Sequence, residues 1–277
     1  MKPRDVIYNK WKRLVVTCSW RKVDFVIAGT QKGGTTALAA YLKQHSDIGI
    51  PEEKELHFFD NEDHFRNGRP PFLLYHLPFF ELRSRRLWGE ATPIYMYWQK
   101  SPERLRRYNP KMKLILLLRN PIARAYSHWN MERALKNEPL SFGEAIFFEQ
   151  ERLRGALPQQ HRVFSYLDRG FYAAQLERIW AHLPRQQTLV LKSEDLKNQP
   201  QPTLDAICHF LGARPLENVQ PAEVHARTYP SPMSAQERNQ LQQVFEPEIR
   251  KLERLLNWDC SHWLADKSDC GQPAVQA

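Results

Sequence analysis

Residues 23–36 read VDFVIAGTQKGGTT, and this stretch is the strongest indication of the fold class. Val23–Ala28 is a continuous apolar run broken only by one aspartate, and it predicts a short buried strand. Gly29–Thr36 is rich in glycine and threonine and predicts a tight loop. Ala37–His45 then has the apolar spacing of a helix. The stretch therefore predicts a strand, a loop and a helix in direct succession.

Two further apolar segments repeat this pattern. Lys113–Leu118 (KLILLL) predicts a strand that ends at Arg119, with Pro121 as the first residue of a helix. Thr188–Lys192 (TLVLK) predicts another strand, followed by a helix near Pro202–Leu211. Continuous apolar strands that alternate with helices are typical of a mainly parallel sheet flanked by helices. We therefore expect one α/β domain whose ligands bind at the carboxyl ends of the strands.

The domain is expected to span residues 23–260, with an N-terminal extension at 1–22 and a C-terminal tail at 261–277. Asn61–Leu87 is rich in proline, arginine and aromatic residues and predicts a long surface excursion. Ser234, with Glu237 three residues later, forms a capping box that predicts a helix running toward Leu256.

The composition is that of a soluble globular protein, with 277 residues of which 42% are hydrophobic and 26% charged. The formal net charge of +9 favours an anionic partner: nucleic acid, an acidic membrane surface or a phosphorylated nucleotide. Met1–Trp20 lacks the pattern of a signal peptide, and the apolar run Leu114–Leu118 is too short to span a bilayer. We therefore expect a cytoplasmic protein.

Cysteines and histidines give no sign of a metal site. The four cysteines are scattered without a CxxC pair, which favours free thiols, although a Cys260–Cys270 disulfide stays open. None of the ten histidines belongs to an HExxH cluster. We expect no catalytic metal.

The loop Gly29–Thr36 has the chemistry of an anion site. Its glycines allow tight turns, its amides and the following helix N-terminus attract an anion, and Lys32 adds a full positive charge. It is not a Walker A loop, because Thr35 stands where that motif requires lysine. The displaced lysine argues against an ordinary ATPase or kinase.

This loop resembles that of the sulfotransferases that use 3′-phosphoadenosine-5′-phosphosulfate (PAPS), especially the heparan sulfate branch. The resemblance implies a P-loop-like sulfotransferase fold. It also implies that the 5′-phosphosulfate is bound by five residues of the loop: Lys32, Gly33, Gly34, Thr35 and Thr36.

The second half of the expected nucleotide site follows Lys113–Leu118. Arg119 and Ser127 lie eight residues apart, and a guanidinium with a hydroxyl suits a terminal phosphate. The resemblance implies that this pair holds the 3′-phosphate. It also implies a basic loop that closes over the donor, made here of Arg227, Thr228 and Tyr229; His225 stands where some members carry lysine. Tyr172 matches a family position near the adenine, and it fits a core position equally well.

The reaction needs a base for the acceptor proton and a cation beside the leaving phosphate. Lys32 suits the second role. Lys54–Asp60 (KELHFFD) resembles the family segment that carries the base, which implies Glu55 as the base beside His57. Regular alternation along an extended segment would place both side chains on one face.

Gly89-Glu90-Ala91 resembles a segment in which heparan-modifying members carry a catalytic lysine after the glutamate. Glu90 is thus a secondary base candidate. Ala91 replaces the lysine, so either Lys54 supplies that charge or the reaction does without it.

We expect a sulfotransferase that moves a sulfuryl group from PAPS to a hydroxyl or amine, leaving 3′-phosphoadenosine-5′-phosphate (PAP). Ala91 favours a small metabolite, such as one of secondary metabolism, over a saccharide. One alternative is an atypical P-loop nucleotide kinase, although no Walker B carboxylate follows Leu114–Leu118. The other is a basic nucleic-acid-binding protein, although no known binding motif is present.

Overall fold

The computed structural model of the chain describes residues 21–217, 219–220 and 231–265. Five parallel strands form one sheet in the order β2-β3-β1-β4-β5. The strands are β1 (Phe25–Gly29), β2 (Ile48–Gly49), β3 (Leu87–Ala91), β4 (Lys113–Leu118) and β5 (Thr188–Lys192). This single α/β domain with a parallel central sheet confirms the predicted fold class.

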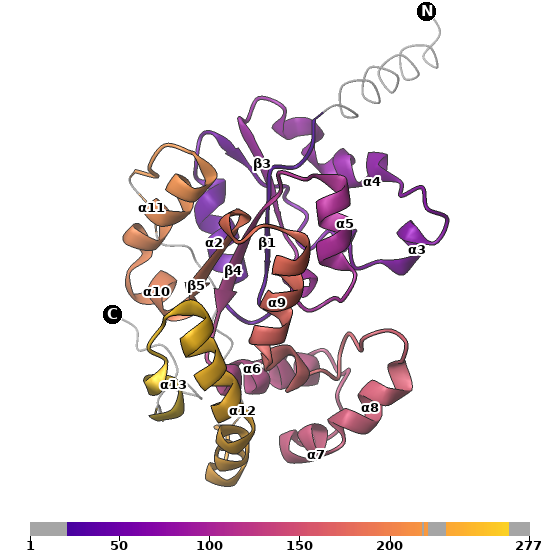
Figure 1. Cartoon of the computed structure of the whole chain (residues 1–277), viewed down its shortest axis with the longest axis vertical. Helices are drawn as coiled ribbons and strands as arrows, with labels where there is room; N and C mark the ends of the chain where they lie inside the picture. The colour runs from indigo at the N-terminus through magenta and orange to yellow at the C-terminus, as the bar shows by residue number, and fades with distance from the viewer. Residues whose placement is uncertain (1–20, 218, 221–230, 266–277) are drawn as a thin grey trace, which may run out of the picture.

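Helices cover both faces of the sheet (Figure 1). Successive residues of β1 and β4 point to opposite faces, so each strand contributes to two hydrophobic clusters. One face packs against α2 (Thr35–Lys43), α10 (Ser193–Asn198) and α11 (Pro200–Leu211). The other packs against four helices: α5 (Ser101–Tyr108), α6 (Pro121–Ala134), α9 (Tyr172–His182) and α12 (Ala235–Leu256).

The remaining elements are short. They are α3 (Glu62–Phe65), α4 (Phe72–His76), α7 (Phe142–Phe147), α8 (Glu149–Ala156), α13 (Ser261–Ala265) and the 3₁₀ turns η1 (Leu77–Leu82), η2 (Pro93–Tyr95), η3 (Asp168–Gly170) and η4 (Arg185–Gln187).

The predicted helix boundaries agree with local capping chemistry. Pro121 is the first residue of α6, and the Asn120 side chain accepts a hydrogen bond from the Ile122 amide over 3.0 Å. Gly212 ends α11 with φ of 74°, where a residue with a Cβ would be strained. The capping box between Ser234 and Glu237 starts α12, as the sequence predicts.

Three features differ from the sequence-based expectations. The strands β2 and β3 were not predicted, because neither is a continuous apolar run. The segment Asn61–Leu87 is not a surface excursion, because it contains α3, α4 and η1 and buries Tyr75 and Phe79 in the core. The domain does not end at residue 260, because α13 packs Trp263 into the core with only 2% of its surface exposed.

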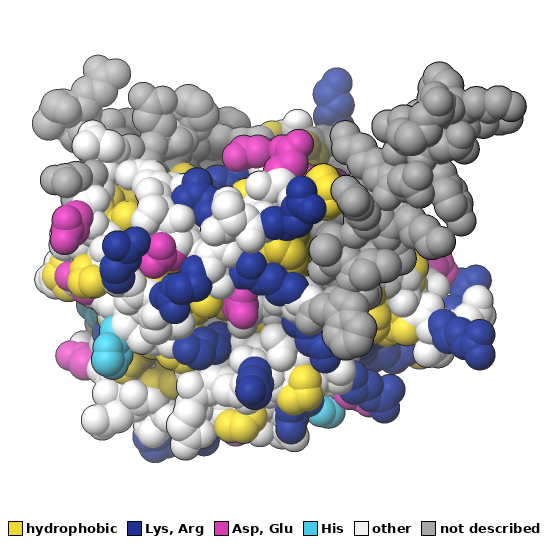
Figure 2. Space-filling view, turned by 90° about the horizontal axis from the view of Figure 1, so that it is seen from above, with side chains coloured by type: hydrophobic (Ala, Val, Ile, Leu, Met, Phe, Trp, Pro, Cys, Tyr) yellow, Lys and Arg dark blue, Asp and Glu magenta, His cyan; other side chains and the backbone are white. Residues whose placement is uncertain are grey.

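Positive and negative side chains are mixed on the face of the molecule seen in Figure 2. Figure 2 shows Lys and Arg side chains spread over the face seen from above, with Asp and Glu side chains among them. Across the described part of the chain, no helix combines the length and the apolar character needed to cross a membrane.

Candidate active site

The loop between β1 and α2, residues 29–36, is pressed against β4. The Thr30 amide donates to the Leu117 carbonyl oxygen over 3.0 Å, and the Gly33 amide donates to the Thr30 carbonyl oxygen over 2.9 Å. A Cβ on Gly33 would lie 2.4 Å from the Leu117 carbonyl oxygen, so only glycine fits there. Gly34 has φ of 92° and caps the N-terminus of α2, whose first residue is Thr35. We call residues 29–36 the donor loop.

Arg119 brings the end of β4 to this loop. Its Nη1 donates to the Lys32 carbonyl oxygen over 3.3 Å, and its own carbonyl oxygen accepts from the Tyr172 hydroxyl over 2.9 Å. Ser127 is buried in α6, the helix that follows Arg119. Tyr172 is fully buried, and its hydroxyl holds the Arg119 backbone. It therefore lies behind Arg119 in the core. The two predicted halves of the nucleotide site therefore meet.

The second group of candidate residues is the base segment, residues 54–60. His57 lies between two carboxylates, with Nε2 3.5 Å from Glu55 Oε2 and Nδ1 2.9 Å from Asp60 Oδ2. Lys54 Nζ lies 3.2 Å from Glu55 Oε1. The predicted alternation is wrong, because Glu55 and His57 have φ of 60° and 49° and the segment is not extended. The left-handed backbone at both residues brings the two side chains together instead.

Aromatic packing fixes the far end of the base segment. Phe58 and Phe59 are buried, and their amides both donate to the Tyr95 hydroxyl, over 3.0 and 3.3 Å. The Phe59 ring packs against the rings of Tyr75 and Tyr95 at centroid distances of 5.0 and 5.6 Å. These contacts hold Phe58 and Phe59 in the core and leave Glu55 and His57 half-buried at its edge.

The charges in the base segment stabilise one another. Hydrogen bonds with Asp60 and Glu55 raise the pKa of His57 from 6.5 to about 9, so its imidazole is protonated at neutral pH. Burial on its own would raise the pKa of Glu55, but the hydrogen bond from His57 and the charge of Lys54 lower it overall. Glu55 is therefore ionised at neutral pH and His57 is a hydrogen-bond donor.

Glu90 lies in a different environment. It is 1% exposed on β3 and accepts hydrogen bonds from the Tyr75 and Thr92 hydroxyls, each over 2.7 Å. Burial raises its pKa to about 7. Ala91, the next residue, is buried and pairs with Ile27 of β1 in the sheet. Glu90 is thus a buried carboxyl held by two hydroxyls, and its role as a secondary base stays a prediction.

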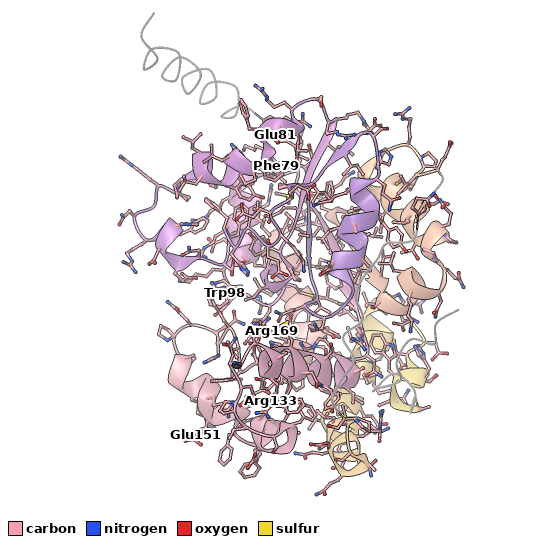
Figure 3. All side chains as sticks on the ribbon, turned by 180° about the vertical axis from the view of Figure 1, so that it is seen from behind. Phe79, Glu81, Trp98, Arg133, Glu151 and Arg169 are labelled. Atoms are coloured by element: carbon pink, nitrogen blue, oxygen red, sulfur yellow. The ribbon has the colours of Figure 1, made fainter. Side chains whose placement is uncertain are left out.

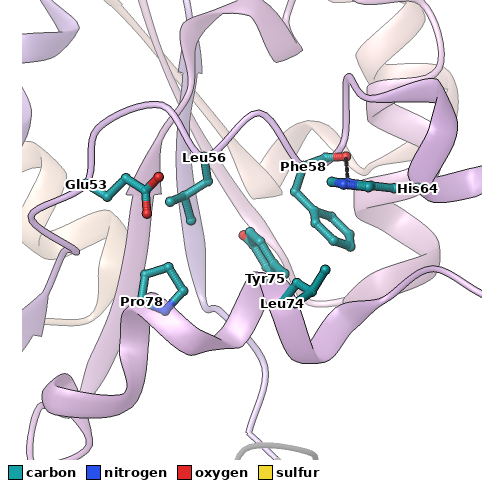
Figure 4. A pocket seen from close by; sticks show the side chains of 7 residues that line it. All are labelled: Glu53, Leu56, Phe58, His64, Leu74, Tyr75 and Pro78. Atoms are coloured by element: carbon teal, nitrogen blue, oxygen red, sulfur yellow. Dashed lines mark hydrogen bonds between the residues drawn. The ribbon is translucent and has the colours of Figure 1, made fainter.

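A small pocket of about 140 Å³ lies beside the base segment (Figure 4). Its walls are mainly apolar and aromatic, with one acidic side chain and one histidine: Leu56, Phe58, Leu74, Tyr75, Pro78, Glu53 and His64. The pocket thus joins the base segment to α3, α4 and η1, the elements of the Asn61–Leu87 segment.

Residues 22–254 match the family model described as the sulfotransferase domain. The chain belongs to the sulfotransferase family. Human bifunctional heparan sulfate N-deacetylase/N-sulfotransferase 3 is 29% identical over 74% of this chain and 24% of its own length. Mouse heparan sulfate glucosamine 3-O-sulfotransferase 5 is 26% identical over 69% of this chain and 53% of its own length. The chain thus spans about a quarter to a half of these relatives, and they confirm the resemblance to the heparan sulfate branch.

Solved sulfotransferases share the fold. A sulfotransferase from Alicyclobacillus acidocaldarius superposes with a TM-score of 0.75 at 29% identity, covering 88% of this chain and 99% of the other. Mouse sulfotransferase SULT7A1 complexed with PAP superposes with a TM-score of 0.54 over 86% of this chain and 89% of the other, and at 14% identity it supports the fold alone. The P-loop-like sulfotransferase fold is confirmed, and membership of the family replaces the kinase alternative.

The candidate site suits an anionic ligand. Sequence reasoning missed Arg124 in α6 and Arg169 in η3, which are 0% and 1% exposed. Among the described residues, Arg124 Nε and Nη1 have no hydrogen-bond partner. Burial lowers the pKa of Arg169 to about 10, so its guanidinium stays charged. Buried cations next to Lys32 and Arg119 favour a multiply charged anion, as PAPS is.

Some predictions fall outside the described residues or concern thiols and metals. The loop of His225, Arg227, Thr228 and Tyr229 lies outside them, and so does the proposed partner of Cys260, at position 270. Cys208 and Cys260 are buried, and they form no disulfide with another described residue. Within the described ranges, no group of three His, Cys, Asp or Glu side chains is arranged to hold a metal ion.

Proposed function

We propose that this chain transfers a sulfuryl group from PAPS to a hydroxyl or amine of a small acceptor, with Glu55 as the base. The observation that carries this proposal is the placement of Glu55 beside a protonated His57 and Lys54. An ionised carboxylate with fixed orientation accepts a proton, whereas a charged imidazole does not. We therefore assign His57 to holding Glu55 rather than to proton transfer.

The residues of the site divide the binding and the chemistry between them, and Lys32 takes part in both. Glu55 removes the acceptor proton as the acceptor atom bonds to sulfur. Lys32 and the amides at the N-terminus of α2 offset the negative charge that grows on the phosphate oxygen as its bond to sulfur breaks. Lys32, Gly33, Gly34, Thr35 and Thr36 bind the 5′-phosphosulfate, and PAP leaves as the product. PAPS supplies the activated sulfuryl group.

The rest of the donor is held by residues that follow β4. Arg119 and Ser127 bind the 3′-phosphate, which is supported by the bond between Arg119 and the donor loop and by the place of Ser127 in α6. Arg227, Thr228 and Tyr229 stay assigned to a loop over the donor on the resemblance alone. No metal takes part in this proposal.

We place the acceptor among small, partly apolar metabolites, such as those of secondary metabolism. The pocket beside the base segment is lined mainly by apolar and aromatic side chains, and Glu53 would repel a polyanionic saccharide there. A saccharide stays a second candidate acceptor, because the relatives named above are heparan sulfate enzymes. A cytoplasmic location is part of the proposal and rests on the scattered cysteines of the sequence, which form no CxxC pair.

One screen tests these points. Purified protein is incubated with ³⁵S-labelled PAPS and either p-nitrophenol, an aliphatic amine or an unsulfated glucosaminyl oligosaccharide, and labelled products are separated. We expect label on the phenol or the amine. Label on the oligosaccharide alone would reassign the acceptor, and failure to bind either PAPS or PAP would reject the proposed function.

A further inference from the structure

Arg162, in the connection between α8 and α9, holds the base segment. Its Nη1 contacts Asp60 Oδ2, and its Nη2 donates to the Asp60 carbonyl oxygen over 2.6 Å. The Asp60 side chain is fully buried, and the same Oδ2 accepts from His57. The Arg162 guanidinium also lies 4.6 Å from the centre of the Trp98 ring. One arginine therefore fixes both the backbone and the carboxylate of the residue that orients His57.

Arg169 extends this contact to the donor loop. Its Nη2 donates to the Arg162 carbonyl oxygen over 2.6 Å, and its Nη1 donates to Gln31 Oε1. Gln31 immediately precedes Lys32 in the donor loop. Figure 3 shows Trp98 and Arg169 close to each other, between the sheet and the helices that carry Arg133 and Glu151. The two arginines thus form a continuous link from Gln31 to Asp60.

This link matters because Lys32 and Glu55, the two side chains assigned to the reaction, both lie outside helices and strands. Lys32, Glu55 and His57 all have positive φ, of 71°, 60° and 49°, in irregular segments. The position of one segment relative to the other therefore depends on side-chain contacts rather than on a shared ladder of backbone hydrogen bonds. In-line transfer is sensitive to that position, since a displacement of about 1 Å costs on the order of a hundredfold in rate.

We propose that Arg162 and Arg169 are positioning residues that couple the donor loop to the base segment. Occupation of the donor loop fixes Gln31, and the two arginines pass this restraint to Asp60, His57 and Glu55. The inference rests on the proposed function for the donor loop and for Glu55. It adds that the base is fully ordered only when the donor is bound.

Hydrogen exchange measured by mass spectrometry tests the coupling, with PAP as the probe and no need for an acceptor. In the wild type, PAP should slow exchange at residues 29–38 and also at residues 54–60. Arg162→Gln should keep the protection of residues 29–38 and lose that of residues 54–60. Arg162→Lys, which keeps the charge and one donor group, should retain part of it. The Arg162 side chain is 45% exposed, so both replacements avoid a core cavity.

Gln31→Ala separates coupling from a merely structural role. It breaks the link at the donor loop without touching the base segment. We expect exchange of residues 54–60 without PAP to match the wild type, and the PAP-dependent protection there to disappear. Arg154→Gln, at an exposed position of α8, is the matched control and should behave as wild type.

The outcomes separate the two proposals. Protection at residues 29–38 but not at 54–60 in the wild type would overturn the coupling and leave the donor site intact. Protection at 54–60 that persists in both Arg162→Gln and Gln31→Ala would do the same. No PAP-dependent protection at residues 29–38 would reject the donor site itself, and the coupling with it.

Discussion

The guanidinium of Arg119 donates a hydrogen bond to the backbone carbonyl oxygen of Lys32 over 3.3 Å. Lys32 follows β1 and Arg119 follows β4, and these strands are neighbours in the parallel sheet. The bond therefore joins two motifs that stand 87 residues apart in the sequence. Both lie at the carboxyl end of the sheet, where α/β folds bind their ligands.

Arg119→Ala should weaken binding of PAP far more than binding of 5′-AMP, because Arg119 is assigned to the 3′-phosphate. The loss of a charge-assisted hydrogen bond costs about 1.5–3 kcal/mol, which is roughly ten- to a hundredfold in affinity. Calorimetry with both nucleotides on both proteins measures it. Equal affinities of the wild type for PAP and 5′-AMP would count against the assignment.

Gly33→Ala should disrupt the donor loop, because the new Cβ would meet the Leu117 carbonyl oxygen at 2.4 Å. Backbone atoms cannot move aside cheaply, so we expect a lower melting temperature and at least about tenfold weaker PAP binding. Gly155→Ala in α8 is the control, since a Cβ there meets nothing within 4 Å. That variant should be about 0.5–1 kcal/mol more stable. Unchanged PAP affinity in Gly33→Ala would show that the loop does not bind the donor.

Glu55→Gln should lower the rate of sulfuryl transfer by about 10²–10⁴, because glutamine keeps the shape but accepts no proton. PAP affinity should hold or rise slightly, since a negative charge near the phosphosulfate is lost. The rate is measured with ³⁵S-labelled PAPS and the acceptor found in the screen.

Glu90→Gln is the matched control for Glu55→Gln. Glu90 is fully buried and both of its oxygens accept hydrogen bonds, so its replacement should change stability more than the chemical step. Normal turnover in Glu55→Gln with loss in Glu90→Gln would reverse the assignment of the base.

The stability of the protein should fall as the pH rises through about 9, in part because of His57. Its folded-state pKa of about 9 lies above the ordinary 6.5, so folding takes up a proton between these values. The stabilisation is complete below pH 6.5 and is lost as His57 deprotonates. The melting temperature of the wild type should decrease more between pH 6 and 10 than that of His57→Gln. His182→Gln, an exposed control on α9, should show the same decrease as the wild type.

Binding of PAP and transfer from PAPS should survive EDTA. In the proposed mechanism, Lys32 and the α2 amides supply the positive charge that a kinase takes from Mg²⁺. Calorimetry and the transfer assay, each with and without chelator, measure this. Complete loss with EDTA and recovery on adding Mg²⁺ would contradict the prediction.

Three strands were predictable, because β1, β4 and β5 are nearly continuous apolar runs. β1 and β4 are buried inside the sheet, whereas β5 is a partly buried edge strand. β3 (LWGEA) was not predictable, because its glycine and glutamate interrupt the apolar run. Their places in the strand depend on neighbours that are distant in the sequence. The Phe25 ring lies 2.1 Å from where a Gly89 Cβ would be, and Tyr75 donates to Glu90. Such contacts leave no pattern within the strand itself.

The sequence alone determined the strand, loop and helix at residues 23–45, the strands β4 and β5, and the family, because glycine spacing, apolar runs and capping residues act over a few positions. Only the tertiary structure decided how Glu55, His57 and Asp60 are arranged, and that Arg162 and Arg169 join them to Gln31. Arginine in a connection is usually solvated, so its residue type predicts no partner. Its role follows from burial and from the carbonyl and carboxylate oxygens that folding brings within reach, which are set by the whole chain.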